Sequence, residues 1–147
     1  GSGTWREPSQ YEVHPQQGFG VHLLHEEPDH SLAVFAVSWR PGGGTPPHDH
    51  GDWGIVVGVD GAEKNVFWER IDDRTRPGYA ELRKTDEKVF VPGEVVAMPT
   101  GTIHSVSNES DRVTLSLHVY GRHLNFAQRS QFKPEQHTEE PFLVRVD

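Results

Sequence analysis

The chain has 147 residues, the size of one domain, and 24% of them are charged. Its formal net charge is −8, and its 14 Lys and Arg residues are scattered among acids, which argues against a surface for nucleic acid or anionic membrane. It has no cysteine, which excludes disulfides, thiolate zinc sites, iron–sulfur clusters and cysteine nucleophiles. Any bound metal must therefore take nitrogen and oxygen ligands.

The composition favours a β-rich protein. Valine is about twice as frequent as leucine, and Gly and Pro together make up 26 residues. No apolar run approaches the roughly 18 residues that a membrane span needs. Residues 1–4 are typical of a cloning remnant rather than a signal peptide, so we expect a cytoplasmic protein.

The predicted elements are short strands separated by turn residues. The first strong one covers residues 31–39, where a continuous apolar run is too short for a typical helix and indicates a buried strand. Seven more follow, at 53–59, 65–69, 79–83, 89–91, 94–98, 103–106 and 113–120. We predict one all-β domain over residues 1–147, a sandwich or small barrel. Residues 122–147 form a C-terminal extension that is harder to assign, in which 142–144 suggest one more strand.

The densest chemical signal is the His-x-His pair formed by His48 and His50. On an extended chain, residues two apart point to the same face, so the two imidazoles project together. A third histidine, His104, follows Pro99 and a turn at Gly101. Two neighbouring imidazoles and one from a distant strand are a common way to build a three-ligand metal site. The alternative is an ordinary surface pair in a chain that contains ten histidines.

Two longer motifs contain these histidines. The first is formed by Gly42, His48, His50, Gly54 and Gly61, and the second by Gly93, Pro99, Gly101, His104 and Asn108. Together they resemble the two cupin motifs, and the resemblance covers about residues 31–120. It implies a cupin double-stranded β-helix, which is a small jelly-roll barrel, with His48, His50 and His104 as metal ligands.

Gly54 departs from the cupin pattern, which has a glutamate ligand there. Position 54 has the same strand parity as 48 and 50, so it faces the same interior. Three neutral imidazoles leave a divalent ion with its full charge of about +2, which favours anionic co-ligands and leaves positions open. The alternative is that the nearby Asp52 completes a mixed site.

Among cupins, a site of three histidines is similar to that of the thiol dioxygenases, the cysteine dioxygenase type. Ser116, His118 and Tyr120 resemble that family's Ser-x-His-x-Tyr strand, and residues 31–50 with Trp39 follow its pattern. The resemblance implies an Fe(II) enzyme that oxidises a small thiol to its sulfinic acid with O2. Tyr120 would lie beside the substrate and dioxygen, oriented by His118 and Ser116. Periodicity alone leaves open whether this polar face or the opposite leucine face is buried.

Two further departures bear on this resemblance. Some thiol dioxygenases link the active-site tyrosine to a cysteine, and without cysteine Tyr120 must be a free phenol, as in the bacterial branch. The family holds the substrate carboxylate with Arg or Gln, and the corresponding position here is His22. The candidate substrate contacts are His22, Arg40 and Trp53, with His25 and Arg122 as alternatives.

Other functions and metals remain open at the level of the sequence. A cupin with three histidines is also compatible with cleavage of a carbon–carbon bond in a β-dicarbonyl, or with metal binding without turnover, as in a sensor or storage protein. Imidazole suits Zn, Ni and Cu as well as iron. The resemblance also makes a homodimer plausible.

Overall fold

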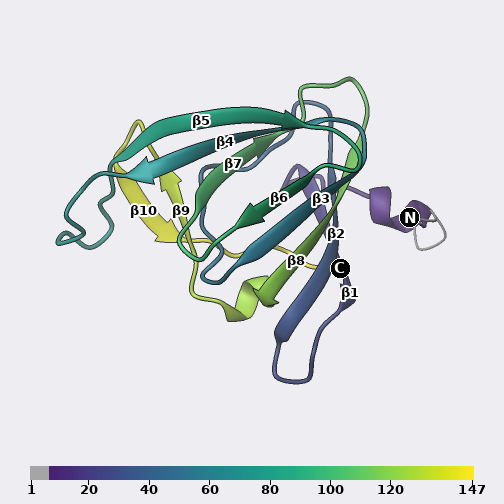
Figure 1. The fold of residues 1–147 in the computed structure, drawn as a ribbon, viewed down its shortest axis with the longest axis horizontal. Helices are drawn as coiled ribbons and strands as arrows, with labels where there is room; N and C mark the ends of the chain where they lie inside the picture. The colour runs from purple at the N-terminus through teal and green to yellow at the C-terminus, as the bar shows by residue number, and fades with distance from the viewer. Residues whose placement is uncertain (1–6) are drawn as a thin grey trace.

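The computed structural model describes residues 7–147, so the expected cloning remnant at residues 1–4 lies outside the described part. Its larger sheet has five antiparallel strands in the order β1-β2-β8-β3-β6 (Figure 1). Their bounds are β1 Phe19–His25, β2 Ser31–Trp39, β8 Thr114–Arg122, β3 Gly54–Asp60 and β6 Val95–Met98.

A second sheet of three strands, in the order β5-β4-β7, lies opposite the first (Figure 1). A hairpin of β9 and β10 lies beside its end, and two short 3-10 helices, η2 and η3, complete the chain. These bounds are β4 Glu63–Arg70, β5 Leu82–Phe90, β7 Ile103–Ser107, β9 Ser130–Lys133, β10 Thr138–Pro141, η2 Pro8–Tyr11 and η3 Leu124–Phe126. The prediction of an all-β fold is confirmed, and no helix among residues 7–147 is long and apolar enough to cross a membrane.

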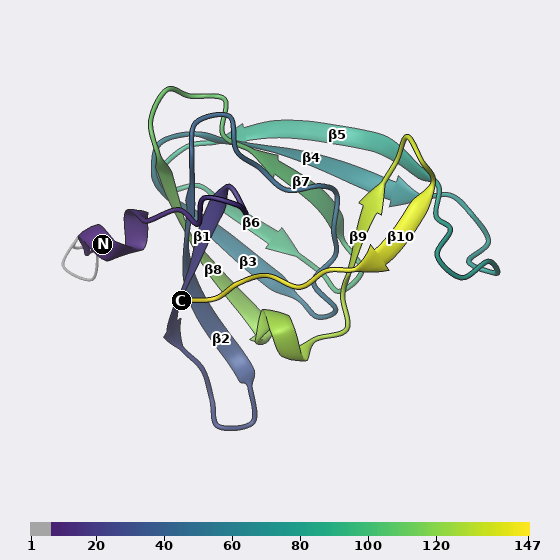
Figure 2. The ribbon, with the colours of Figure 1, turned by 180° about the vertical axis from the view of Figure 1, so that it is seen from behind.

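The main core lies between the sheets and is closed by the C-terminal segment. Phe35 and Trp39 of β2 are buried there, together with Phe142 and Val144 from beyond β10. The segment after β10 runs back to β1, where the backbone of Asp147 exchanges hydrogen bonds of 2.7 and 2.9 Å with Val21 and Leu23 (Figure 2). The predicted strand at residues 142–144 is wrong, because this segment lies outside every ladder and is held by its buried side chains.

The strand predictions hold best where apolar residues dominate. The strand at 31–39 is β2 as predicted, whereas the separate strands at 79–83 and 89–91 are wrong, because β5 (Leu82–Phe90) runs unbroken between them. Residues 83–88 of β5 are charged or polar and exposed, which is typical of an edge strand, and pairing with β4 keeps them extended. β1 was not predicted, because only Phe19, Val21 and Leu23 mark its apolar face.

Asn108 joins the end of β2 to the turn before β8. It is buried, and its side-chain Nδ2 donates to the carbonyl oxygens of Trp39 and Arg112 at 2.9 and 2.8 Å. Its Oδ1 accepts from the backbone N–H and the hydroxyl group of Ser110. This asparagine of the second cupin-like motif therefore has a structural role, since it saturates buried backbone groups near the barrel core.

We expect Asn108→Ala to lower the free energy of unfolding by about 2–4 kcal/mol, because it leaves a buried carbonyl oxygen without its donor. Urea denaturation monitored by tryptophan fluorescence measures the change. Asp111→Ala, at an exposed position of the same turn, is the control and should have little effect. Equal stability of the two variants would contradict the anchoring role of Asn108.

Candidate metal centre

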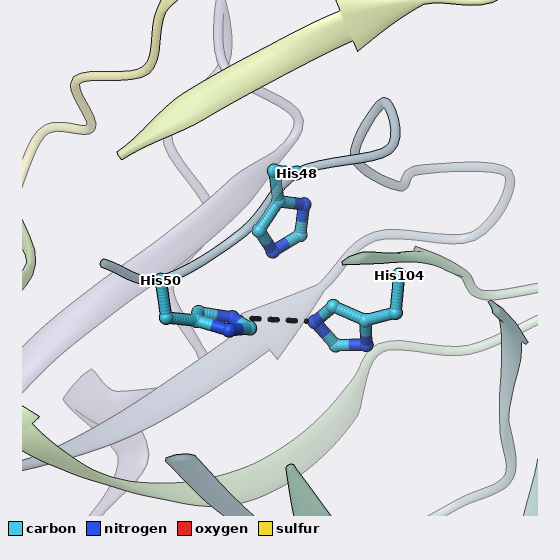
Figure 3. A group of neighbouring side chains, drawn as sticks. All are labelled: His48, His50 and His104. Atoms are coloured by element: carbon cyan, nitrogen blue, oxygen red, sulfur yellow. Dashed lines mark hydrogen bonds between the residues drawn. The ribbon is translucent and has the colours of Figure 1, made fainter. Parts of the chain in front are cut away.

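Three buried histidines converge between the sheets (Figure 3). His48 and His50 lie in the extended segment before β3, and His104 is the second residue of β7. The backbones of His48 and His104 pair directly, each N–H donating to the other's carbonyl oxygen at 2.9 and 3.0 Å. This pairing fixes the distant segments side by side, and the nitrogen atoms available as ligands all lie within 4.8 Å of one another.

Hydrogen bonds on the far side of two rings orient their free nitrogens. His48 Nδ1 lies 2.9 Å from the carbonyl oxygen of Pro46, and His104 Nδ1 lies 2.8 Å from Oδ1 of the buried Asn65. Both partners are acceptors, so each Nδ1 carries the proton and each Nε2 keeps its lone pair. Nε2 of His104 lies 3.3 Å from Nε2 of His50 (Figure 3). Two nitrogens about 2.1 Å from one ion and at right angles would be about 3 Å apart, so the arrangement fits a shared metal.

Burial keeps the three imidazoles neutral. Desolvation is the main cause that lowers the pKa of His48 and His50 well below the usual value, and it lowers the pKa of His104 to about 3. Repulsion among the rings and from Arg129 acts in the same direction. Neutral imidazole is the form that binds metal, so the site keeps its ligand form well below pH 6.5.

Gly54 leaves room for the ring of Tyr120. The two residues are paired across β3 and β8, and a Cβ atom at position 54 would lie 2.9 Å from both Cδ1 and Cε1 of the tyrosine. The Tyr120 ring also stacks on His50, with the ring centroids 4.9 Å apart. Asp52 does not supply the missing carboxylate, since its Oδ1 accepts from the backbone N–H of Trp53 at 2.8 Å.

The polar face of β8 is turned inward and forms a hydrogen-bonded relay. His118 Nδ1 lies 2.7 Å from the Tyr120 hydroxyl group, and His118 Nε2 lies 2.8 Å from the hydroxyl group of Ser116. All three residues are buried, and Trp39 Nε1 donates to Ser116 Oγ at 3.4 Å. Burial lowers the pKa of His118 to about 3 and raises the pKa of Tyr120, so both groups are neutral at pH 7.

A cavity of about 30 Å³ lies between the histidines and the relay. His48, His104, His118 and Tyr120 line one side, and the remaining lining is mostly apolar and includes Phe142. Its volume is close to that of one water molecule, so a larger ligand requires the lining to move. The C-terminal segment that carries Phe142 is the covering element, since its ring packs 5.0 Å from that of His48.

Arg129 brings a positive charge to this cavity. It is 7% exposed, its Nε donates to the carbonyl oxygen of Phe142 at 3.2 Å, and its guanidinium group lies over the Phe142 ring. Desolvation lowers its pKa to about 10, an effect that Tyr120 and Asp49 partly oppose. Among residues 7–147, no carboxylate lies within 4 Å of the guanidinium group. Arg129 therefore remains a buried cation able to pair with an anion.

The three substrate contacts predicted from the sequence lie elsewhere. His22 Nε2 is 2.9 Å from the carbonyl oxygen of Glu12, in a surface groove beside β1. Arg40 is exposed and lies beside Gly18, and the indole of Trp53 lies against Gly121. None of the three lines the cavity next to the histidines.

Sequence reasoning missed two buried charged side chains, Arg129 and Glu63. Arg129 lies in the polar stretch after β8, where no periodicity distinguishes it from exposed arginines. Glu63 follows the Gly61 turn and begins β4, and its 5% exposure is unusual for a glutamate. The parity it shares with the inward-facing Asn65 was the one available signal for Glu63.

Comparison with known proteins supports the fold. No family model matches the chain. An oxalate oxidase solved with the substrate analogue glycolate superposes with a TM-score of 0.59 and 20% identity, over 83% of this chain and 58% of that chain. KdgF from Halomonas sp. superposes with a TM-score of 0.54 and 18% identity, over 76% of this chain and 84% of that one.

A third structural neighbour is itself a cupin. A cupin superfamily protein from Desulfitobacterium hafniense superposes with a TM-score of 0.53 and 15% identity, over 76% of this chain and 84% of that chain. The chain has the cupin jelly-roll fold. This result confirms the predicted fold class, and in this cupin fold the three histidines lie inside the barrel.

We expect removal of Asn65 to weaken metal binding without abolishing it. Asn65→Ala frees the His104 ring and should reduce the affinity for Co(II) or Fe(II) about 10–100-fold, while His104→Ala should remove measurable binding. Competition with a chelator under anaerobic conditions measures both. His25→Ala, which changes an exposed histidine, is the control. Undiminished binding by the His104→Ala protein would exclude the site.

The buried histidines should make the metal-free protein acid-labile. Their pKa values are lowered by folding, so between about pH 6.5 and pH 3 the unfolded chain binds protons that the folded chain does not. For each such proton, the free energy of unfolding falls by up to about 1.4 kcal/mol for every pH unit by which the pH is lowered. Glu63 has the opposite effect, because folding raises its pKa to about 7 and the folded chain therefore binds one proton more readily than the unfolded chain. We expect the unfolding midpoint in urea to fall steadily from pH 6.5 to 4.5, and a constant midpoint would contradict neutral burial.

Proposed function

We propose that this protein is a metal-dependent dioxygenase that converts a small carboxylate-bearing thiol into its sulfinic acid. The observation that carries the proposal is the Ser116–His118–Tyr120 relay ending beside three converging imidazoles. The cupin fold of structural neighbours such as an oxalate oxidase is compatible with a metal-dependent oxidoreductase. The reaction is balanced without another reductant: RSH and O2 give RSO2H, the sulfur loses four electrons and both oxygen atoms are incorporated.

His48, His50 and His104 are the residues that would hold the metal, which we propose to be Fe(II). When bound, ferrous iron would supply open coordination positions and the redox chemistry for O2. Residues 7–147 contribute three neutral ligands and no carboxylate, so the ion would keep its charge and favour a thiolate. Zinc or nickel also suits three imidazoles, so the metal present in a purified sample does not by itself identify the cofactor.

Tyr120 is the residue we propose to contact the reacting groups. Its hydroxyl group is held by His118, and its ring is fixed between Gly54 and His50. Because burial raises the pKa of the phenol, the proton stays on the tyrosine oxygen at neutral pH. Tyr120 thus keeps a hydroxyl proton at a fixed position beside the cavity, and Ser116 and His118 orient it as positioning residues.

Arg129 is our candidate for binding the substrate carboxylate, in place of His22, Arg40 and Trp53. It combines burial, a place in the cavity lining and the lack of a paired carboxylate among residues 7–147. It also lines a surface groove formed by residues 127–130 and 139–143, so it lies between the cavity and the exterior. A carboxylate entering from this side would meet the guanidinium group first and would neutralise the buried cation.

Oxygen uptake by the anaerobically Fe(II)-loaded protein tests the proposal. The substrates are cysteine, 3-mercaptopropionate, mercaptosuccinate, cysteamine and acetylacetone. We expect uptake with at least one carboxylate-bearing thiol, with one O2 consumed per sulfinate, and a loss of at least about tenfold in Tyr120→Phe. Uptake with acetylacetone alone would replace the proposal by carbon–carbon cleavage. If none of the five compounds causes oxygen uptake at full iron occupancy, the result would favour a metal-binding protein without turnover.

We expect Arg129→Met to lower kcat/KM for carboxylate-bearing thiols about 10–100-fold, because a charge-assisted hydrogen bond is lost. Activity with cysteamine, which has no carboxylate, should change little. Arg122→Met is the matched control, because that arginine is exposed and lies outside the cavity lining. An equal loss with cysteamine would show that Arg129 acts on the fold rather than on the substrate.

A further inference from the structure

Glu63 lies at the inner end of the relay, on the side away from Tyr120. It is the first residue of β4 and is 5% exposed, and its Oε2 is buried without a hydrogen-bond partner among residues 7–147. The neighbouring hydrogen-bonding groups that lower the pKa of its carboxyl group belong to Thr114 and Ser116 of β8 and to Trp39 of β2. Ser116 is therefore adjacent both to this carboxyl group and to the His118 ring.

Ser116 has a single hydroxyl proton and can donate it in one direction only. If Glu63 is ionised, it can only accept, so Ser116 donates to the carboxylate and accepts from a protonated His118 Nε2. If Glu63 is protonated, its O–H can donate to Ser116, which then donates to an unprotonated His118 Nε2. The Trp39 N–H donates to Ser116 Oγ in both arrangements, because the oxygen has two lone pairs.

The direction of the hydrogen bond between Ser116 and His118 determines the direction of the one between His118 and Tyr120. A neutral imidazole carries one proton, so a protonated Nε2 leaves Nδ1 as an acceptor that takes the Tyr120 hydroxyl proton. An unprotonated Nε2 places the proton on Nδ1, which then donates to the tyrosine oxygen and frees its O–H to point into the cavity. We propose that Glu63 is a positioning residue that sets the direction of this hydrogen-bond chain and thereby whether Tyr120 presents a donor to the cavity.

The electrostatic surroundings of Glu63 favour a change in the ionisation of its carboxyl group near neutral pH. Desolvation raises its pKa to about 7, and the three polar neighbours only partly oppose this effect. The nearest charged side chains along the chain face elsewhere, since Lys64 pairs with Glu87 and Glu109, and Asp60 pairs with Arg112. His118 has a pKa of about 3, so between pH 5.5 and 8.5 its ring changes tautomer rather than charge.

The tautomer of His118 tests the inference in the metal-free full-length chain, without substrate. Long-range 1H–15N correlation on 15N-labelled protein shows which ring nitrogen carries the proton. We expect Nδ1–H at pH 5.5 and Nε2–H at pH 8.5, with the tautomer ratio changing about tenfold per pH unit around a midpoint near 7. In Glu63→Gln the tautomer should be independent of pH, while the exposed control Glu135→Gln should behave as the wild type.

A second variant keeps the test decisive if Glu63→Gln does not fold. Ser116→Ala removes the hydroxyl group that neighbours both the carboxyl group and the ring, so His118 should then keep one tautomer while the 13C carboxyl shift of Glu63 still titrates. A wild-type tautomer that stays constant from pH 5.5 to 8.5 would overturn the inference, as would an unchanged transition in Ser116→Ala. Because the measurement needs no turnover, its failure is distinguishable from failure of the proposed function.

Discussion

Three uncharged imidazoles share one buried point, no carboxylate oxygen of residues 7–147 joins their ligand atoms, and much of the structure serves this constraint. The backbone pairing of His48 with His104 brings the two motifs together. The acceptors at Pro46 and Asn65 turn the Nε2 lone pairs inward, and desolvation keeps the rings unprotonated. The hydrogen bonds stabilise the fold, whereas the buried Nε2 lone pairs that face one another cost stability until a cation is shared.

The absence of a side chain at position 54 is the second determinant of the site. A glutamate there would collide with the Tyr120 ring, so in this chain the inward-facing phenol excludes an acidic ligand at position 54. The Tyr120 phenol connects the three histidines to a row of polar side chains on β8, first His118 and then Ser116, with Glu63 beyond it. One glycine thus links the lack of an acidic side chain beside the three histidines to the presence of the Ser116–His118–Tyr120 relay.

The sequence predicted the parts of the protein that depend on local spacing. The bounds of β2 follow from a short continuous apolar run, the shared face of His48 and His50 from alternation, and the place of His104 from the second cupin-like motif. Burial of the polar face of β8 could not be decided in this way, because Leu115 on the opposite face is buried as well. Arg129 and Glu63 escaped prediction because their burial depends on long-range packing, by the C-terminal segment over Arg129 and by β2 and β8 around Glu63.

The number and kind of ligands on the bound metal show directly whether the three histidines form one site. X-ray absorption spectroscopy of the Fe(II)- or Co(II)-loaded protein counts imidazole rings through their multiple scattering. We expect one ion per chain with three imidazole ligands, no protein carboxylate and solvent or substrate in the remaining positions. Fewer than three imidazoles, or a coordinated side-chain carboxylate such as that of Asp52, would show that His48, His50 and His104 do not form such a site.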